Sequence, residues 1–232
     1  MRTYRPRTGP FILGYHFEPQ ELDDLCLDAL KKGKFLPNEP APVRIEAFIE
    51  NYFRCVIDYR DLGPGILGCT SFSDKGKVLE VVVSSRLTDE KTEGNDRRLN
   101  STFAHEAGHC LLHAGLFIDA GKELILRDDV DLGARRILCR DDHVGYDRSG
   151  KVRWWEYQAN RAIGGFLLPR VLVDRALEPY FKRGPISHAL ELDEGRRREA
   201  ELFVADTFKV NPVVAHYRLG GFYPPSNGQL SF

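Results

Sequence analysis

Apolar residues recur at helical spacing in the first quarter of the chain. From Leu22 to Lys32 they lie three or four positions apart, and the same spacing returns from Arg44 to Phe53. This period places the apolar side chains on one face of a helix, so both segments are predicted to be amphipathic helices. The proline-containing stretch from Lys34 to Pro42 indicates a linker, and residues 1–20 show no period and are expected to be irregular.

The period then changes to that of strands. Ile66 to Phe72 and Val78 to Ser84 are rich in β-branched and aromatic residues. The five residues between them, Ser73 to Lys77, include a glycine and favour a turn. The sequence therefore predicts two strands joined as a hairpin, with Val78 to Val83 as the strongest strand signal in the chain.

Helices are predicted again in the second half. Residues 87–96 are polar and are expected to form an exposed loop, and Arg98 to Ala114 is predicted to be a helix that ends at Gly115. Leu116 to Gly150 predicts no definite element. Further helices are predicted over 154–168 (before Pro169), 170–177, 194–207 and 212–219. The order of helices, a small sheet and more helices is typical of an α+β fold.

Composition excludes several classes of protein. Hydrophobic residues make up 42% of the 232 positions, charged residues 29%, and the net charge is -1, so no overall basic field attracts nucleic acid. No apolar run approaches the roughly 20 residues of a membrane helix, and no signal peptide is recognised. The five cysteines are odd in number and widely spaced, which argues against a disulfide framework. We expect a single cytoplasmic domain, with an N-terminal extension and helix (1–43), a core (44–170) and a C-terminal helical part (171–232).

A metal-binding pattern lies inside the helix predicted from Arg98. In the segment from His105 to His109 two histidines are four residues apart, so both rings project from one helical face and can reach the same Zn²⁺. Glu106 is displaced by about 100° around the axis. It is badly aimed for a ligand but can reach a metal-bound water, as in His-Glu-x-x-His peptidases. The alternative interpretation is a core helix that happens to carry histidines.

Gly108 is unusual in the middle of this helix. Glycine in a helix interior costs about 1 kcal/mol relative to alanine. Close approach of another chain segment, or of a substrate, is the reason that we expect for its presence.

A catalytic zinc needs a third protein ligand. His113 lies about 6 Å of rise beyond His109, too far to share the site easily, and is interpreted as a core residue or one that supports a ligand. His143 is in a segment of no predicted structure. Glu156 begins a second helix, where it is either a ligand or simply an acid in the first helical turn. A separate structural metal site that uses Cys110, Cys139 and His143 is a weaker alternative.

Two blocks of sequence resemble the ImmA/IrrE metallopeptidases, which cleave phage repressors. The first runs from Thr102 to His109, and the second from Glu156 to Pro169 resembles the family's Glu-x-x-Ala-Asn element and its proline stop. Weaker similarity spans most of residues 40–220, although residues 118–150 form a longer insertion than the family pattern. The resemblance implies one zinc per chain, held by His105, His109 and Glu156, with Glu106 as the catalytic base. It also implies a zincin-like core, in which a small antiparallel sheet packs on the zinc-binding helix pair and C-terminal helices follow.

The expected activity is zinc-dependent hydrolysis of a peptide bond, with a helix-turn-helix repressor as the implied protein substrate and no direct contact with nucleic acid or membrane. A zinc-binding regulator that inactivates a transcription factor without cleavage is the alternative. Asn160, one turn after Glu156, is a candidate to orient a ligand. The strand from Val78 to Val83 either lies at a sheet edge, where a substrate strand pairs with it, or is buried. Candidates to stabilise the oxyanion are Tyr157 and His143, and also Tyr146, His188 and Tyr217.

Overall fold

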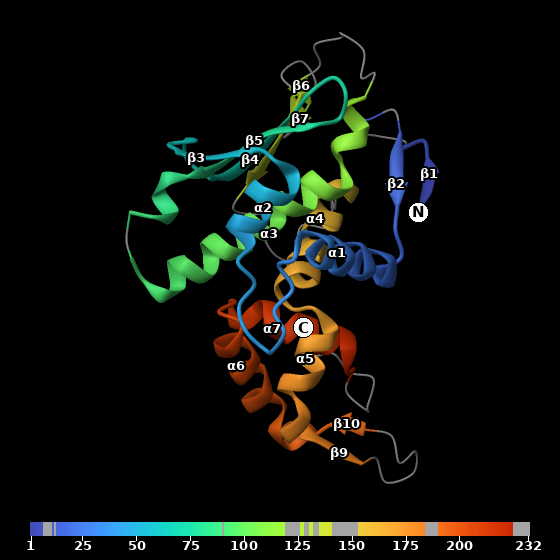
Figure 1. The fold of residues 1–232 in the computed structure, drawn as a ribbon, viewed down its shortest axis with the longest axis vertical. Coiled ribbons are helices and arrows are strands. Elements are labelled where there is room, and N and C mark those ends of the chain that lie inside the picture. Colours follow the sequence, from blue (N-terminus) through green and yellow to red (C-terminus); the bar gives the residue numbers. More distant parts are fainter. Residues whose placement is uncertain are drawn as a thin grey trace.

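The computed structural model describes residues 1–6, 11, 13–89, 91–118, 126–127, 130–131, 135–140, 153–183 and 190–224. The chain is an α+β protein in which a sheet lies above a pair of packed helices and a helical C-terminal part lies below them (Figure 1). The longer helices are α1 (Pro19–Gly33), α2 (Ile45–Phe53), α3 (Glu93–Leu112), α4 (Trp154–Leu167), α5 (Arg170–Ala176), α6 (Arg197–Thr207) and α7 (Pro212–Phe222).

The main sheet has six strands in the order β3-β5-β4-β8-β7-β6. Its strands are β3 (Val56–Arg60), β4 (Ile66–Phe72), β5 (Val78–Ser84), β6 (Leu126–Arg127), β7 (Val130–Asp131) and β8 (Arg136–Arg140). The predicted hairpin is present as the antiparallel pair β4–β5. The sheet is nevertheless larger than expected and not wholly antiparallel, because β3 joins β5 in parallel.

The position of β5 decides between the two interpretations of its apolar run. This strand lies between β3 and β4, and Val81, Val82 and Val83 are at most 3% exposed. It is therefore an interior strand, and the idea that it is an edge open to a substrate strand is wrong. A continuous β-branched run is the pattern of a strand covered on both faces, which explains the outcome.

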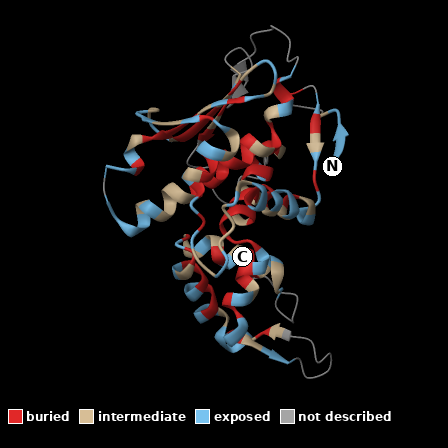
Figure 2. Cartoon of the chain, viewed as in Figure 1, coloured by how far each residue is buried: buried red, intermediate tan, exposed pale blue. Residues whose placement is uncertain are grey.

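Helix α3 lies under the sheet and packs along α4, and these two helices hold much of the core (Figure 2). Thr92 caps α3 by accepting a hydrogen bond from the backbone N–H of Asn95 at 3.2 Å. The helix therefore begins at Glu93, within the polar segment that was predicted to be a loop. The first turns of α3 are polar because they project away from the core. A polar segment without apolar periodicity can therefore be helical, which is why the prediction of a loop there is wrong.

Short strands at both ends were missed in the sequence. Residues expected to be irregular form β1 (Arg2–Tyr4) and β2 (Gly14–His16), which pair in antiparallel fashion and contact α4 through Trp154 and Gln158. In the C-terminal part β9 (Phe181–Arg183) pairs with β10 (Leu190–Leu192). Strands of three residues are too short to show a period of two, which is why pattern analysis did not detect them.

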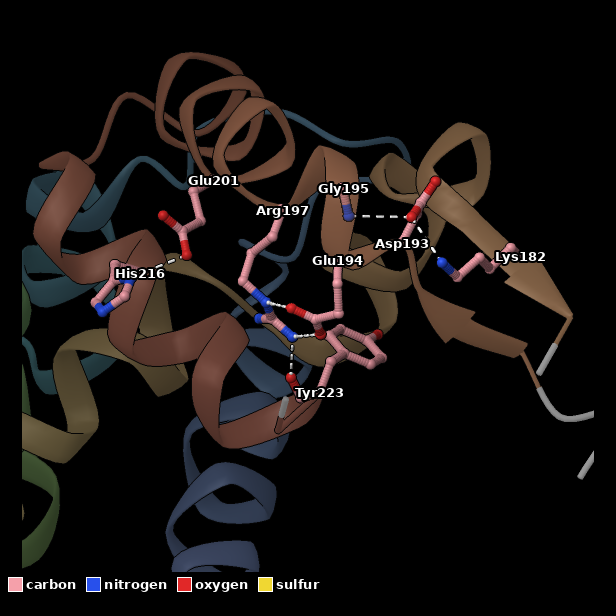
Figure 3. Close-up of polar contacts among 8 residues, drawn as sticks. All are labelled: Lys182, Asp193, Glu194, Gly195, Arg197, Glu201, His216 and Tyr223. Atoms are coloured by element: carbon pink, nitrogen blue, oxygen red, sulfur yellow. Dashed lines mark hydrogen bonds and ion pairs between the residues drawn. The ribbon is translucent and has the colours of Figure 1, made fainter. Parts of the chain in front are cut away.

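Polar contacts join β9, β10 and the last two helices, as Figure 3 shows. Arg197 donates hydrogen bonds to both carboxylate oxygens of Glu194, at 2.6 and 2.8 Å, and to the backbone carbonyl of Tyr223 at 2.6 Å. The buried carboxylate of Glu201 on α6 contacts His216 Nδ1 on α7 at 2.8 Å. These contacts tie α6 to α7 across the bend between them.

The predicted helices are all present, with ends that shift by a few residues. Among the described residues, no helix combines the length and the apolar character that crossing a membrane requires. The sequence interpretation as an α+β fold with C-terminal helices is confirmed.

Candidate metal centre

The close packing of α3 on α4 creates the site. A Cβ atom added to Gly108 would lie 2.9 Å from Ala162 Cβ and 3.1 Å from Ala159 Cα. Only glycine therefore allows the two helices to approach this closely, and another chain segment, not a substrate, explains its presence. This approach brings Glu156, in the first turn of α4, next to His105 and His109 of α3.

Three side chains converge with their ligand atoms facing one another. His105 Nε2 and His109 Nε2 are 2.9 Å apart, Glu156 Oε2 is 3.2 Å from His105 Nε2, and Glu156 Oε1 is 3.6 Å from His109 Nε2. Both histidines are fully buried and Glu156 is 4% exposed. This group can hold a metal ion.

The separations fit a tetrahedral zinc site. Ligand atoms about 2.0–2.1 Å from a tetrahedral ion lie about 3.4 Å from each other. The contacts between the ligand atoms, from 2.9 to 3.6 Å, span this value. Neither carboxylate oxygen of Glu156 has a hydrogen-bond partner among the described residues, which for a buried carboxylate is costly without a cation nearby. Two imidazoles and a carboxylate form the His₂Glu ligand set that catalytic zinc uses.

A chain of hydrogen bonds determines the tautomer of His109. The backbone carbonyl of Tyr15 can only accept, so it accepts from the Gln158 amide nitrogen at 2.6 Å. Gln158 Oε1 then accepts from His113 Nε2 at 3.0 Å, which leaves His113 Nδ1 to accept from His109 Nδ1 at 2.9 Å. With its proton on Nδ1, His109 directs the lone pair of Nε2 at the ligand group. His113 therefore supports a ligand and does not itself belong to the converging set.

Asn160 orients the other histidine in the same way. Its Oδ1 lies 3.0 Å from His105 Nδ1, so the amide oxygen accepts the Nδ1 proton and frees Nε2 for a metal. Asn160 lies one turn after Glu156 on α4, so a single helix supplies one candidate ligand and the group that orients another.

Burial keeps two of these rings neutral. It lowers the pKa of His113 to about 4, and it lowers the pKa of His109 well below the usual value. For His105 burial also disfavours the charge, but the attraction of the Glu156 carboxylate, 3.2 Å from Nε2, outweighs it and the pKa is raised.

Glu106 faces the sheet from α3. Its Oε2 accepts a hydrogen bond from the Thr70 hydroxyl at 2.5 Å, while Oε1 is buried without a hydrogen-bond partner among the described residues. Burial raises the pKa of this carboxyl to about 7, against the opposing attraction of His105 and the Thr70 hydrogen bond. A carboxylate whose pKa lies near neutrality is suited to act as a general base at that pH.

Gly68 on β4 makes room for this carboxylate. A Cβ atom at this position would lie 2.9 Å from the carboxyl carbon of Glu106 and 3.1 Å from its Cγ. The glycine therefore allows β4 to pass directly over Glu106, with Thr70 two residues further on the same strand.

The structure also places Cys139 of β8 beside the site. Its sulfur, with donor atoms of His105 and Glu106, forms a second group that can hold a metal ion. A separate structural site of Cys110, Cys139 and His143 receives no support from this arrangement, because Cys139 joins the His105 region and His143 lies outside the described residues. All five cysteines are buried and none forms a disulfide.

Of the oxyanion candidates, the structure describes Tyr157 and Tyr217. Tyr157 is 43% exposed and makes none of the described contacts with His105, His109 or Glu156. Tyr217 lies on α7. The remaining candidates, His143, Tyr146 and His188, lie outside the described residues.

Sequence analysis missed Thr70, Gly68, Gln158 and the carbonyl of Tyr15. A glycine inside a predicted strand is a signal for close approach, and Gly68 could have been found in this way. The contacts of Gln158 with Tyr15 and His113 join three segments distant in the chain, and no local pattern predicts them.

Comparison with known proteins finds no family model that matches this chain and no curated protein that matches it significantly. The resemblance to the ImmA/IrrE metallopeptidases therefore rests on the two sequence blocks that contain His105 and Glu156.

Proposed function

We propose that this chain is a zinc-dependent endopeptidase related to the ImmA/IrrE metallopeptidases, which hydrolyses a peptide bond in a cytoplasmic transcriptional repressor or another regulatory protein. The observation that carries the proposal is the convergence of His105, His109 and Glu156, with the carboxylate of Glu106 beside them. The resemblance supplies the class of substrate, and the ligand set supports the chemistry.

Different residues of the chain would bind the metal, transfer the proton and orient the base. His105, His109 and Glu156 would hold the ion, and a zinc ion there would supply a bound water of lowered pKa and a Lewis acid for the scissile carbonyl. Glu106 would accept the proton of the attacking water at Oε1, the oxygen that Thr70 does not contact, and would donate it to the leaving amine. The Thr70 hydrogen bond holds the other oxygen, so the carboxylate keeps one orientation during both transfers.

The test compares the protein with Glu106→Gln and Glu156→Gln, each purified, loaded with zinc and incubated with a repressor encoded beside its own gene. Glu106→Gln is expected to keep one zinc per chain and lose cleavage by at least about a hundredfold, the low end of what a general base contributes. Glu156→Gln is expected to lose zinc as well. Cleavage that survives in Glu106→Gln contradicts the proposed base, and an uncut repressor with the native protein contradicts the proposed substrate.

A second candidate is a zinc-binding regulator that inactivates a transcription factor without cutting it. The burial of the site favours it, since His105, Glu106 and His109 are fully buried and a substrate carbonyl must reach them for cleavage. If Glu106→Gln inactivates the partner as well as the native protein does, binding alone explains the activity.

A further inference from the structure

A cavity of about 410 Å³ lies between the start of α1, the middle of α4, Arg170 of α5 and the outer face of α7. None of the three candidate metal ligands lines it. This volume falls in the range that small-molecule sites occupy, roughly 300–1,000 Å³. Asn160 lines the cavity, and its side chain contacts His105. Asn160 therefore lies between a molecule in the cavity and the candidate metal centre.

Three arginines line this cavity, and their charge is only partly compensated. Arg218 is 8% exposed and ion-paired with Asp23 at 2.7 Å, and Arg170 lies 3.7 Å from Asp174. Arg161 makes no hydrogen bond or ion pair with any described residue, although it is half-buried. The other acid of the lining, Glu18, lies 3.7 Å from Arg2, so three arginines face two acids among the residues that line the cavity. The cavity therefore carries an excess of positive charge that is centred on Arg161 and Arg170.

Two glycines, one on α4 and one on α7, line the cavity. A Cβ atom at Gly164 of α4 would lie 3.0 Å from Arg218 Cδ, so the glycine gives the arginine its place in the lining. A Cβ atom at Gly221 of α7 would have no neighbour within 4 Å, so the space beside it is unfilled.

The rest of the lining is largely apolar and includes an aromatic ring. Val213 and Val214 come from the first turn of α7, Phe222 comes from its end, and Ile163 comes from α4. Val213 is 52% exposed, so its side chain is accessible to a molecule in the cavity. The guanidinium carbons of Arg170 and Arg218 lie 5.1 and 4.2 Å from the centre of the Phe222 ring. An aromatic ring that is stacked with arginines is a surface for a flat molecule that carries a negative charge.

We propose that this cavity is a binding site for a small organic anion, with a carboxylate or phosphate group held by Arg161 and Arg170 and a flat apolar body against Val213, Val214 and Phe222. Arginine forms paired hydrogen bonds with a carboxylate and with a phosphate. The ligand that we expect is therefore an apolar ring that carries either of these oxyanions. This proposal is independent of the metal centre and of peptidase activity.

The test is calorimetric titration of the full chain, with and without zinc, using benzoate, phenyl phosphate and the neutral analogue benzamide. At least one of the two anions is expected to bind saturably, and benzamide is expected to bind at least about tenfold more weakly, a difference of about 1.4 kcal/mol. Benzoate and phenyl phosphate distinguish the two anionic groups.

Two variants locate the binding. Arg161→Ala removes the arginine that makes no ion pair with the described residues and is expected to weaken anion binding at least about tenfold. Gly221→Leu adds a side chain where space is free, keeps the fold and is expected to block the cavity. The matched control is Arg86→Ala, since Arg86 is half exposed, pairs with Asp61 at 3.0 Å and lies outside the cavity.

The proposal is overturned if neither anion binds saturably at millimolar concentration. It is equally overturned if an anion binds but Arg161→Ala and Gly221→Leu leave its affinity unchanged, because the anion then lies elsewhere. Loss of binding in both variants with retention in Arg86→Ala supports it.

Discussion

His113 Nε2 lies 3.0 Å from Gln158 Oε1, and this contact between α3 and α4 determines which nitrogen of His109 faces the candidate metal. Gln158 is itself oriented by the carbonyl of Tyr15, so a backbone atom of β2 sets the proton positions two rings away. Substitution of a residue that orients a metal ligand in this way typically lowers metal affinity or activity about 10- to 100-fold.

Gln158→Leu removes the acceptor for the His113 proton. The ring of His113 can then take the other tautomer, which leaves His109 Nδ1 without its acceptor and disturbs the direction of Nε2. We expect zinc affinity to fall about 10- to 100-fold, measured by competition with a chelator of known affinity. The control is Tyr157→Phe, the neighbouring residue on α4 that is 43% exposed. Equal zinc affinity in Gln158→Leu and the native protein would show that the chain of hydrogen bonds is unimportant.

Gly108→Ala tests the approach of the two helices. Alanine improves helix propensity, but its methyl group would lie 2.9 Å from Ala162 Cβ. We expect destabilisation of about 1–3 kcal/mol in urea unfolding, together with weaker zinc binding, since α4 must move and carries Glu156. The matched control is Gly94→Ala in the first turn of α3, where the nearest atom is Thr92 Oγ1 at 3.9 Å and no loss is expected. A Gly108→Ala protein as stable as the control would contradict the close-packing argument.

Glu106→Gln is expected to stabilise the metal-free protein above neutral pH. The pKa of Glu106 is about 7 in the folded state and 4.5 without its environment, so only the unfolded chain loses this proton as the pH rises between these values. The native protein therefore loses about 3 kcal/mol over this window, and the loss is complete above pH 7. Below pH 4.5 the carboxyl is protonated in both states and contributes no difference.

Glutamine cannot ionise, and its oxygen can still accept from Thr70. Denaturant unfolding of metal-free Glu106→Gln and native protein at about pH 8 and about pH 5 measures the effect, which should be larger at the higher pH. A stability difference that is independent of pH would mean that burial of Glu106 does not penalise its charge.

Cys139 and Glu156 belong to two different groups that can each hold a metal ion, and His105 is common to both groups. Substituting Cys139 and Glu156 one at a time shows which group binds the ion. Glu156 lies beside two histidines whose Nε2 atoms are directed at it by the hydrogen bonds of Asn160 and His113. We therefore expect Glu156→Ala to lose zinc. Cys139→Ala is expected to retain about one zinc per chain, as measured by elemental analysis of purified protein. Loss of zinc in Cys139→Ala with retention in Glu156→Ala would place the ion against β8 instead.

The period of a helix was enough to place some of the site. His105 and His109 share a face of α3 because they are four residues apart, and Glu106 turns away from that face for the same reason. The hairpin of β4 and β5 could also be predicted, since each strand is long enough to show its enrichment in β-branched and aromatic residues. Short strands such as β1 and β2, and the insertion that contains β8, gave no readable pattern.

The sequence by itself determined the two histidines, the carboxylate beside them and the α+β order of elements, because these depend on the geometry of a single helix and on local preference. Only the tertiary structure decided that Glu156 meets the histidines, that Thr70 and Gly68 accommodate Glu106, and that Tyr15 and Gln158 fix the proton on His109. Each of these contacts joins segments far apart in the chain. Such contacts follow from how α3 packs on α4 and under the sheet, and that packing depends on side-chain shape and not on periodicity.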